Sequence, residues 1–230
     1  MHAFEPAVSR KILLNLAIGA LFALVSACDA SLESEDGNSK VNGSIRVPVG
    51  RAPADVKTVN GSIRVDANAS IDDATTVNGS VDLGPHAKGA RLKTVNGGIS
   101  LDEGAQATEL KSVNGALSLR RGAELSGSLT SVNGNISVTA AHVGGMIHTE
   151  AGDITVSGAT RVDRGIVIEK PSGSVFGSDP TIIIGPGVTV GGDLKFERKV
   201  RLFVSDKATI GNVSGATAIT FSGDKPPNAT

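Results

Sequence analysis

The stretch KTVNGGISL, from Lys93 to Leu101, contains a word that recurs along the chain. KTVNG also occurs at Lys57 to Gly61, and TVNGS begins at Thr76. The Asn-Gly pairs lie 18, 18, 18, 18 and 19 residues apart and begin at Asn42, Asn60, Asn78, Asn96, Asn114 and Asn133. A degenerate copy, EAGDITV, follows with Gly152 in the glycine position. A repeat of nearly fixed length indicates one small structural unit stacked many times.

Alignment of the copies on the Asn-Gly pair gives columns of apolar residues. Words such as SIRV alternate apolar and polar residues with a period of two, which is typical of a β-strand. We expect the apolar columns to point inward and to form ladders between neighbouring repeats. These columns are Val41, Val59, Val77, Val95, Val113 and Val132; Ile45, Ile63, Val81, Ile99, Leu117 and Ile136; Val47, Val65, Leu83, Leu101, Leu119 and Val138; Ala69, Ala87, Ala105 and Ala123; and Val56, Ala74, Leu92 and Leu110.

Two further columns are polar, and we expect both on the solvent side. The hydroxyl column is Thr58, Thr76, Thr94, Ser112 and Ser131, where β propensity explains the residue types. The second column is Arg46, Arg64, Asp82, Ser100, Ser118 and Ser137. Arg64 and Asp82 would lie one coil apart, close enough for a surface ion pair of small energetic value.

Two all-β architectures fit this pattern. A strand with an inner apolar face every 18 residues predicts one coil of a single-stranded parallel β-solenoid. Asn-Gly between apolar alternations is also the strongest short signal for a two-residue hairpin, which would give an antiparallel β-meander. We favour the solenoid because a fixed perimeter explains the constant period, whereas the loops of a meander can vary in length.

The pattern weakens after Val156 but continues. The glycines at Gly173, Gly192 and Gly211 are each followed two places later by an apolar residue, as Gly152 is. With these copies the chain has about ten coils, or about 45–50 Å at about 4.8 Å per coil. Phe176, Phe196, Phe203 and Phe221 all lie in this half and indicate a wider core.

The N-terminus has the features of a targeting segment. Arg10 and Lys11 precede an apolar stretch from Ile12 to Ala27, which is short for a bilayer-spanning helix. The stretch ends in VSAC, which resembles the bacterial lipobox, with the only cysteine of the chain, Cys28, at the lipidated position. We therefore expect the protein to be lipid-anchored in the cell envelope, on the periplasmic face or at the cell surface.

These observations divide the chain into five parts. We expect a lipoprotein signal peptide over 1–27, the lipidated cysteine and a flexible acidic linker over 28–39, and regular coils over 40–156. An irregular continuation of the solenoid follows over 157–223, and a disordered tail over 224–230.

The repeated VNG words behind an envelope signal resemble the β-strand-repeat domains of unknown function that are classed as adhesin-type. The resemblance covers about Lys40 to Val156, implies an envelope β-solenoid and brings no catalytic residues with it. A weaker likeness, in IIIGPGVTVGGDL from Ile182 to Leu194, is to the polymer-forming bactofilins.

The composition and motifs give little support for chemistry. The chain has 22 Lys+Arg against 23 Asp+Glu, which gives no electrostatic basis for binding nucleic acid. Asp72, Asp73, Asp102 and Glu103 are the nearest approach to an acidic patch, and His86, His142 and His148 lack metal-ligand spacing. The coils over 40–156 contain no aromatic residue, which weakens both glycosidase and lectin functions. We expect no catalytic residue, metal or cofactor.

The sequence therefore favours a non-catalytic, adhesin-like or structural interaction scaffold. Its expected partners are the membrane through the lipid, and an envelope protein, a cell-wall polymer or a second copy of the chain. Two alternatives stay open: a carbohydrate-active parallel β-helix enzyme, and a self-polymerising structural protein of the bactofilin type. Converging carboxylates in a groove would favour the enzyme, and uncapped apolar ends would favour polymerisation.

The Asn-Gly pairs predict a specific structural feature. We expect each pair to form a bend, because Asn tolerates left-handed backbone geometry and Gly adopts it freely. Stacking would bring successive Asn side chains to about 4.8 Å, close enough for each amide to donate to the next coil. The predicted ladder contains Asn42, Asn60, Asn78, Asn96, Asn114 and Asn133.

Overall fold

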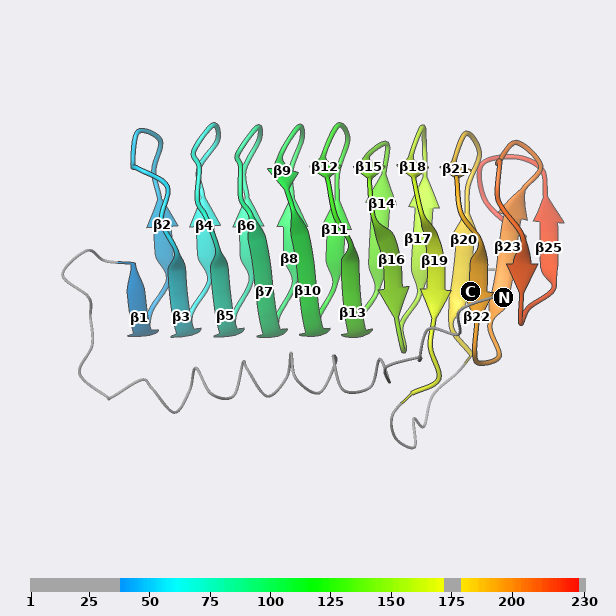
Figure 1. Ribbon diagram of the computed structural model, residues 1–230, viewed down its shortest axis with the longest axis horizontal. Coiled ribbons are helices and arrows are strands. Elements are labelled where there is room, and N and C mark those ends of the chain that lie inside the picture. Colours follow the sequence, from blue (N-terminus) through cyan, green and yellow to red (C-terminus); the bar gives the residue numbers. More distant parts are fainter. Residues whose placement is uncertain (1–37, 172–178, 228–230) are drawn as a thin grey trace, which may run out of the picture.

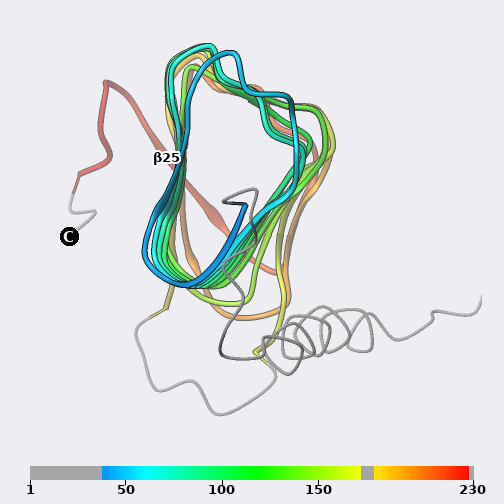
Figure 2. The same cartoon turned by 90° about the vertical axis from the view of Figure 1, so that its left-hand side faces the viewer.

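The computed structural model describes residues 38–171 and 179–227, which contain strands and no helix. They form a β-solenoid, a rod in which the coils stack from β1 at one end to β25 at the other (Figure 1). Seen along the rod, the coils lie over one another and enclose the core (Figure 2). The expected signal peptide, Cys28, most of the linker, Gly173 and Phe176 fall outside the described residues. Within them, no helix is long and apolar enough to cross a membrane.

Three sheets form the sides of the coils. Sheet A has ten strands in the order β1 (Ser39–Asn42), β3 (Val56–Asn60), β5 (Ala74–Asn78), β7 (Arg91–Asn96), β10 (Glu109–Asn114), β13 (Leu129–Asn133), β16 (Met146–Thr149), β19 (Gly165–Ile168), β22 (Leu194–Phe196) and β24 (Val213–Ser214). Sheet B has ten in the order β2 (Ile45–Val47), β4 (Ile63–Val65), β6 (Val81–Leu83), β8 (Ile99–Leu101), β11 (Leu117–Leu119), β14 (Ile136–Thr139), β17 (Ile154–Ser157), β20 (Thr181–Ile184), β23 (Arg201–Ser205) and β25 (Ala218–Phe221). Sheet C has five in the order β21 (Thr189–Val190), β18 (Arg161–Val162), β15 (His142–Val143), β12 (Glu124–Leu125) and β9 (Gln106–Ala107).

The predicted solenoid of about ten coils is confirmed, and the antiparallel meander is wrong. Successive strands of the chain lie in different sheets, and each strand pairs in parallel with its counterpart one coil away. Ile99, for example, pairs with Val81 in the preceding coil and with Leu117 in the next. The Asn-Gly pair is therefore the corner between sheets A and B, and not a hairpin turn.

Four of the five expected apolar columns form the core. Leu92, Ile99, Leu101 and Ala105, one from each column, are all at most 1% exposed. Because each buried Leu or Ile side chain contributes about 1.5–3 kcal/mol, a ladder of such residues is the main favourable term for stacking. Ala105 lies at a corner between strands, where a small side chain fits.

The faces of the valine and hydroxyl columns are the reverse of those expected. Thr58, Thr76 and Thr94 are buried at 4%, 0% and 2% exposure, whereas Val59 and Val95 point outward and are partly exposed. Alternation explains the reversal, because Thr94 is two residues from the buried Leu92 and Val95 is three. The hydroxyl column is therefore part of the core.

The C-terminal half continues the same sheets, but two glycines in it were assigned to the wrong corner. Gly192 and Gly211 precede the sheet A strands β22 and β24, whereas Gly152 lies between β16 in sheet A and β17 in sheet B. A Cβ on Gly211 would lie 2.5 Å from the carbonyl oxygen of Gly192, so these two glycines share one file. Phe196 and Phe221 are buried at 4% exposure.

The two ends of the rod differ. In the first coil Ile45 and Val47 are buried, at 3% and 1% exposure. In the last coil Val213 and Ala218 are only partly buried against the core, and Ile219 is 51% exposed. Each end also exposes one large apolar side chain, because Val49 near the first coil is 65% exposed.

Candidate interaction surface

The six asparagines of the Asn-Gly corner form one hydrogen-bonded file. The Nδ2 of each donates to the Oδ1 of the asparagine one coil earlier. The Nδ2–Oδ1 distances are 3.0 Å for Asn60 to Asn42, 2.8 Å for Asn78 to Asn60, 2.9 Å for Asn96 to Asn78, 3.1 Å for Asn114 to Asn96 and 3.3 Å for Asn133 to Asn114. All six side chains are exposed, so water can replace a lost partner.

Glycine follows asparagine for a steric reason, and the left-handed geometry we expected is found only at the two ends of the series. Gly43 and Gly152 have φ of 115° and 106°, but Gly61, Gly79 and Gly97 are not in that region. A Cβ on Gly97 would instead lie 2.0 Å from the carbonyl oxygen of Gly79. The coils therefore approach too closely at this corner for any side chain.

The same glycine carbonyls accept hydrogen bonds from the buried hydroxyl column. The bonds run from Thr58 to Gly43 (3.1 Å), Thr76 to Gly61 (2.8 Å), Thr94 to Gly79 (2.9 Å) and Ser112 to Gly97 (3.1 Å). Ser131 breaks the series, because its buried hydroxyl has no hydrogen-bond partner among the described residues. Its coil is the one with the 19-residue interval, although Ser131 keeps its place in the register beside Ser112.

The outer face of sheet A carries an apolar strip beside the asparagine file. It consists of the outward valines, Val41, Val59, Val77, Val95, Val113 and Val132, and we call it the valine file. At about 4.8 Å per coil its six members extend over about 24 Å. Lys57, Lys93 and Lys111 lie in the adjacent outward file. In the next coils the valine position holds Glu150 and then Glu169, so the apolar strip ends there.

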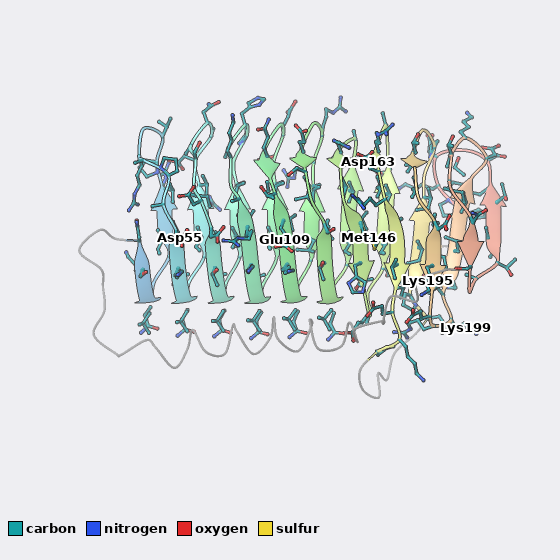
Figure 3. The ribbon with its side chains drawn as sticks, viewed as in Figure 1. Asp55, Glu109, Met146, Asp163, Lys195 and Lys199 are labelled. Carbon is teal, nitrogen blue, oxygen red and sulfur yellow. The ribbon has the colours of Figure 1, made fainter. Side chains whose placement is uncertain are left out.

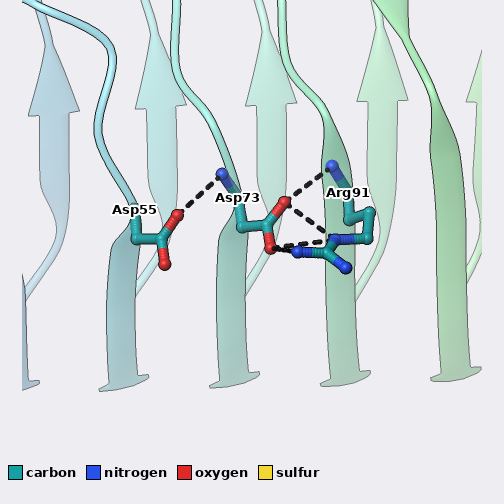
Figure 4. Close-up of polar contacts among 3 residues, drawn as sticks. All are labelled: Asp55, Asp73 and Arg91. Carbon is teal, nitrogen blue, oxygen red and sulfur yellow. Dashed lines mark hydrogen bonds and ion pairs between the residues drawn. The ribbon is translucent and has the colours of Figure 1, made fainter.

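A third file on sheet A is charged, and it joins the coils through their backbone. Asp55 Oδ1 accepts from the backbone N–H of Asp73 at 3.3 Å, and Asp73 Oδ1 accepts from the N–H of Arg91 at 3.1 Å (Figure 4). The Arg91 Nε also donates to Asp73 Oδ2 at 2.9 Å. The hydrogen bond from the Arg91 guanidinium lowers the pKa of Asp73. Figure 3 shows Asp55, Glu109 and Met146 along this edge of the rod.

The outer face of sheet B is polar, and its expected ion pair does not form. Arg64 and Asp82 are neighbours in the register, but Asp82 accepts a hydrogen bond from the Ser80 hydroxyl at 2.8 Å. Arg46 instead pairs with Asp66 at 2.8 Å. Ser100 and Ser118 follow in the same file, so this face presents small hydroxyl groups.

A depression of about 480 Å³ lies at the corner between sheets B and C. It is lined by small residues, including Ala123, Ala140, Ala141 and Ala159, and by the polar residues Glu124, His142, Arg161 and Asp163. It has a clear origin in the register. Leu125 is six positions after Leu119, but in the next coil the paired residue Val143 is only five positions after Val138. We call this depression the notch.

The polar wall of the notch is an ion network. Asp163 accepts from Arg161 Nε at 2.6 Å and lies 3.0 Å from His142 Nε2. His142 Nδ1 is 4.0 Å from Glu124 Oε1. Hydrogen bonds from His142 and then Arg161 lower the pKa of Asp163. The one sign of this group in the sequence is the shortened spacing between Val138 and Ala141.

The other candidate residues do not converge. His86 is at a corner with φ of 57°, His142 is on sheet C, and His148 is on sheet A, where its Nε2 lies 3.3 Å from Glu169. Asp73 binds Arg91, and Asp102 binds Arg120 at 3.4 Å on a different corner. Over residues 38–171 and 179–227, no group of three His, Cys, Asp or Glu side chains is placed to hold a metal ion.

Comparisons with known proteins give no relative. The chain matches no protein-family model, no curated protein and no solved structure. A functional proposal therefore depends on the chain's own residues.

Proposed function

We propose that the protein is a lipid-anchored, non-catalytic scaffold of the bacterial cell envelope, and that its sheet A face binds an envelope protein. The observation that supports this most directly is the valine file, an apolar strip kept in register over six coils between asparagine amides and lysines. Outward-facing Val in six successive coils is unexpected on a surface that only meets water. The VSAC word at Val25 to Cys28 and the resemblance to adhesin-type repeats support the location and the class.

The chemistry of this face defines a partner. Desolvation of the partly exposed valines would supply most of the binding energy, and the rim of Asn amides and Lys ammonium groups would supply orientation. A complementary protein surface would present an apolar ridge with acceptor groups along both sides. Because the coils are joined by sheet hydrogen bonds along the whole rod, the face is rigid and little ordering entropy is lost on binding.

Matched surface variants test this proposal. Val77→Glu combined with Val95→Glu places two charges in the strip, whereas Ser100→Glu combined with Ser118→Glu places two charges on the polar sheet B face. Chemical crosslinking in intact cells, followed by purification of the protein, should recover a partner with the wild type and the sheet B variant but not with the sheet A variant. Recovery of a second copy of the chain would support self-association, and recovery that is unchanged in both variants would contradict the proposal.

The notch favours a second candidate, a carbohydrate-active enzyme. A carboxylate, a histidine and a second carboxylate line this depression. Such a reaction would use Asp163 or Glu124 as acid or base. Loss of glycan cleavage in His142→Gln and Asp163→Asn, measured on purified cell-wall glycan strands, would support it. Absence of cleavage by the wild type would exclude the enzymatic function.

A further inference from the structure

The asparagine file consists of six copies of the most labile dipeptide in protein chemistry. In a flexible chain the backbone nitrogen of the following residue can attack the side-chain amide carbon of asparagine. Glycine allows this attack most readily because it has no side chain to hinder the approach. All six asparagines of the file are exposed and precede glycine, so water and base can reach them.

The reaction needs only water. The glycine nitrogen loses its proton to base and forms a bond to the asparagine Cγ, and the bond from Cγ to the side-chain nitrogen breaks, so that ammonia leaves. A five-membered succinimide results. Water then opens this ring at either carbonyl and gives aspartate or isoaspartate. The net change is the addition of one water and the loss of one ammonia.

The solenoid holds both reacting groups of the interior pairs. In Asn96 the side-chain nitrogen donates to Asn78 at 2.9 Å, and the side-chain oxygen accepts from Asn114 at 3.1 Å. The attacking nitrogen, on Gly97, donates its proton to the backbone oxygen of Asn114 at 2.9 Å. The attack therefore requires the corner to open first.

The two ends of the file are held less well. Among the described residues, no donor reaches the side-chain oxygen of Asn133, and its bond to Asn114 is the longest in the file at 3.3 Å. Gly134 donates to Ala151 at 3.3 Å, also longer than the other bonds of its kind. At the opposite end, the Gly43 N–H donates to Asn60 at 2.9 Å and Asn42 Oδ1 accepts from Asn60, so that only the Asn42 Nδ2 makes no hydrogen bond to a described residue.

We propose that the asparagine file is a set of deamidation sites that react in order from Asn133 inward, whereas Asn42 reacts at the other end without releasing Asn60, because its aspartate product still accepts from Asn60. Conversion of Asn133 to aspartate removes the amide that donates to Asn114, so Asn114 becomes the new end. Aspartate also places a negative charge one coil from the next side-chain oxygen, and isoaspartate adds a methylene to the main chain, which breaks the register of the stacked coils. The age of the protein would thus be recorded from the Asn133 end of the file.

The order of reaction can be read by peptide mapping. Trypsin places each of the six asparagines in a different peptide, since Lys or Arg separates every pair of them. The folded protein is incubated in mildly alkaline buffer, and deamidation is followed at each site by mass spectrometry, with urea-unfolded protein in parallel. We expect Asn78 and Asn96 to react at least about tenfold more slowly in the folded protein than in urea, because opening is needed. Asn42 and Asn133 should react first in the folded protein.

A variant tests the inward progress. In Asn133→Asp, which has the product in place, deamidation at Asn114 should speed up while Asn78 keeps its rate. Asn135→Asp, at the residue before β14, adds the same charge nearby, keeps an acceptor for the backbone N–H of Asp153, leaves the file untouched and serves as the control. Equal rates at all six sites of the folded wild type, or faster reaction at Asn78 than at Asn133, would overturn the proposal. Circular dichroism checks that each variant is folded. The order of deamidation among the six sites of the wild type tests the proposal without any variant.

Discussion

The Thr94 hydroxyl donates a hydrogen bond at 2.9 Å to the carbonyl oxygen of Gly79, one coil earlier. The same oxygen would lie 2.0 Å from a Cβ on Gly97. One backbone carbonyl thus explains two features of the repeated word: the hydroxyl residue two places before the asparagine, and the glycine after it. The carbonyl points into the next coil, where it excludes a side chain and needs a buried donor.

Removal of this donor should destabilise the solenoid. Thr94→Val keeps the shape of the side chain but leaves the Gly79 carbonyl without it, so we expect a loss of about 1–3 kcal/mol. Thr75→Val makes the same change on the outer face of sheet A, where an effect within about 0.5 kcal/mol is expected. Urea unfolding of the purified mature chain measures both. Equal effects of the two variants would show that the buried hydrogen bond contributes nothing.

The sequence predicted the coils and their number, but it did not predict which face each residue occupies in sheet A. Both Leu92 and Val95 were expected inside, although residues three apart in a strand point to opposite faces. The apolar character of valine hid this contradiction, and the polar character of Thr94 suggested solvent. The buried carbonyl of a glycine needs a hydrogen-bond donor, and this need outweighs both preferences. It becomes visible only when two coils are stacked.

The notch was beyond sequence reasoning for a different reason. It exists because the corner before Ala141 is one residue shorter than the corner before Ala123, while another corner, between Leu125 and Leu129, is one residue longer than its predecessor. The longer corner accounts for the 19-residue interval, and the shorter corner returns the following coil to 18 residues. Only the register of three sheets shows where each change lies, and thereby which of the four polar side chains meet.

The inner ladder of sheet B gives a sharper test of packing. Ile99 is 1% exposed and lies between Val81 and Leu117. Ile99→Asp would bury an unpaired charge and should cost several kcal/mol or unfold these coils. Ser100→Asp, on the outer face, should change the urea midpoint very little. Similar damage from both variants would contradict the alternation along β8.

Acid should remove the contribution of the Asp73–Arg91 pair. Hydrogen bonding by Arg91 places the pKa of Asp73 below its ordinary value of 3.8 in the folded state. The contribution is therefore complete above the unfolded pKa and is lost as the pH falls through the lower folded pKa. Because the pair is at the surface, we expect Asp73→Asn to cost about 0.5–1 kcal/mol near neutral pH.

The measurement compares urea midpoints of the wild type and Asp73→Asn at neutral pH and below about pH 3, where unfolded carboxyl groups are protonated. The difference between the two proteins should shrink in acid. Asp72→Asn, at the neighbouring exposed carboxylate, is the control and should show little difference at either pH. A difference that grows on acidification would give the opposite sign and exclude a lowered pKa.

The proposed lipid anchor predicts how a Cys28 variant behaves. Each buried CH₂ of an acyl chain contributes about 0.8 kcal/mol, so several chains hold a protein firmly on a bilayer. Cys28→Ala should abolish incorporation of a labelled fatty acid and release the protein from membranes. Ser26→Ala, two residues earlier, should leave both unchanged. If Cys28→Ala still sediments with membranes after a carbonate wash, an uncleaved apolar segment is the anchor.

Neighbouring asparagines of the file should be coupled in their contributions to stability, because each pair shares one hydrogen bond. Asn78→Ala removes its bonds to Asn60 and Asn96, and Asn96→Ala removes its bonds to Asn78 and Asn114. The double variant removes three bonds, because the Asn78–Asn96 bond is shared. Since these side chains are exposed, each bond contributes only about 0.5–1.5 kcal/mol. The double variant should therefore cost less than the sum of the singles by the value of one bond.

The control is Asn60→Ala combined with Asn114→Ala, which share no bond and should be additive. Strict additivity in both pairs, measured by urea unfolding, would mean that each asparagine acts only within its own corner.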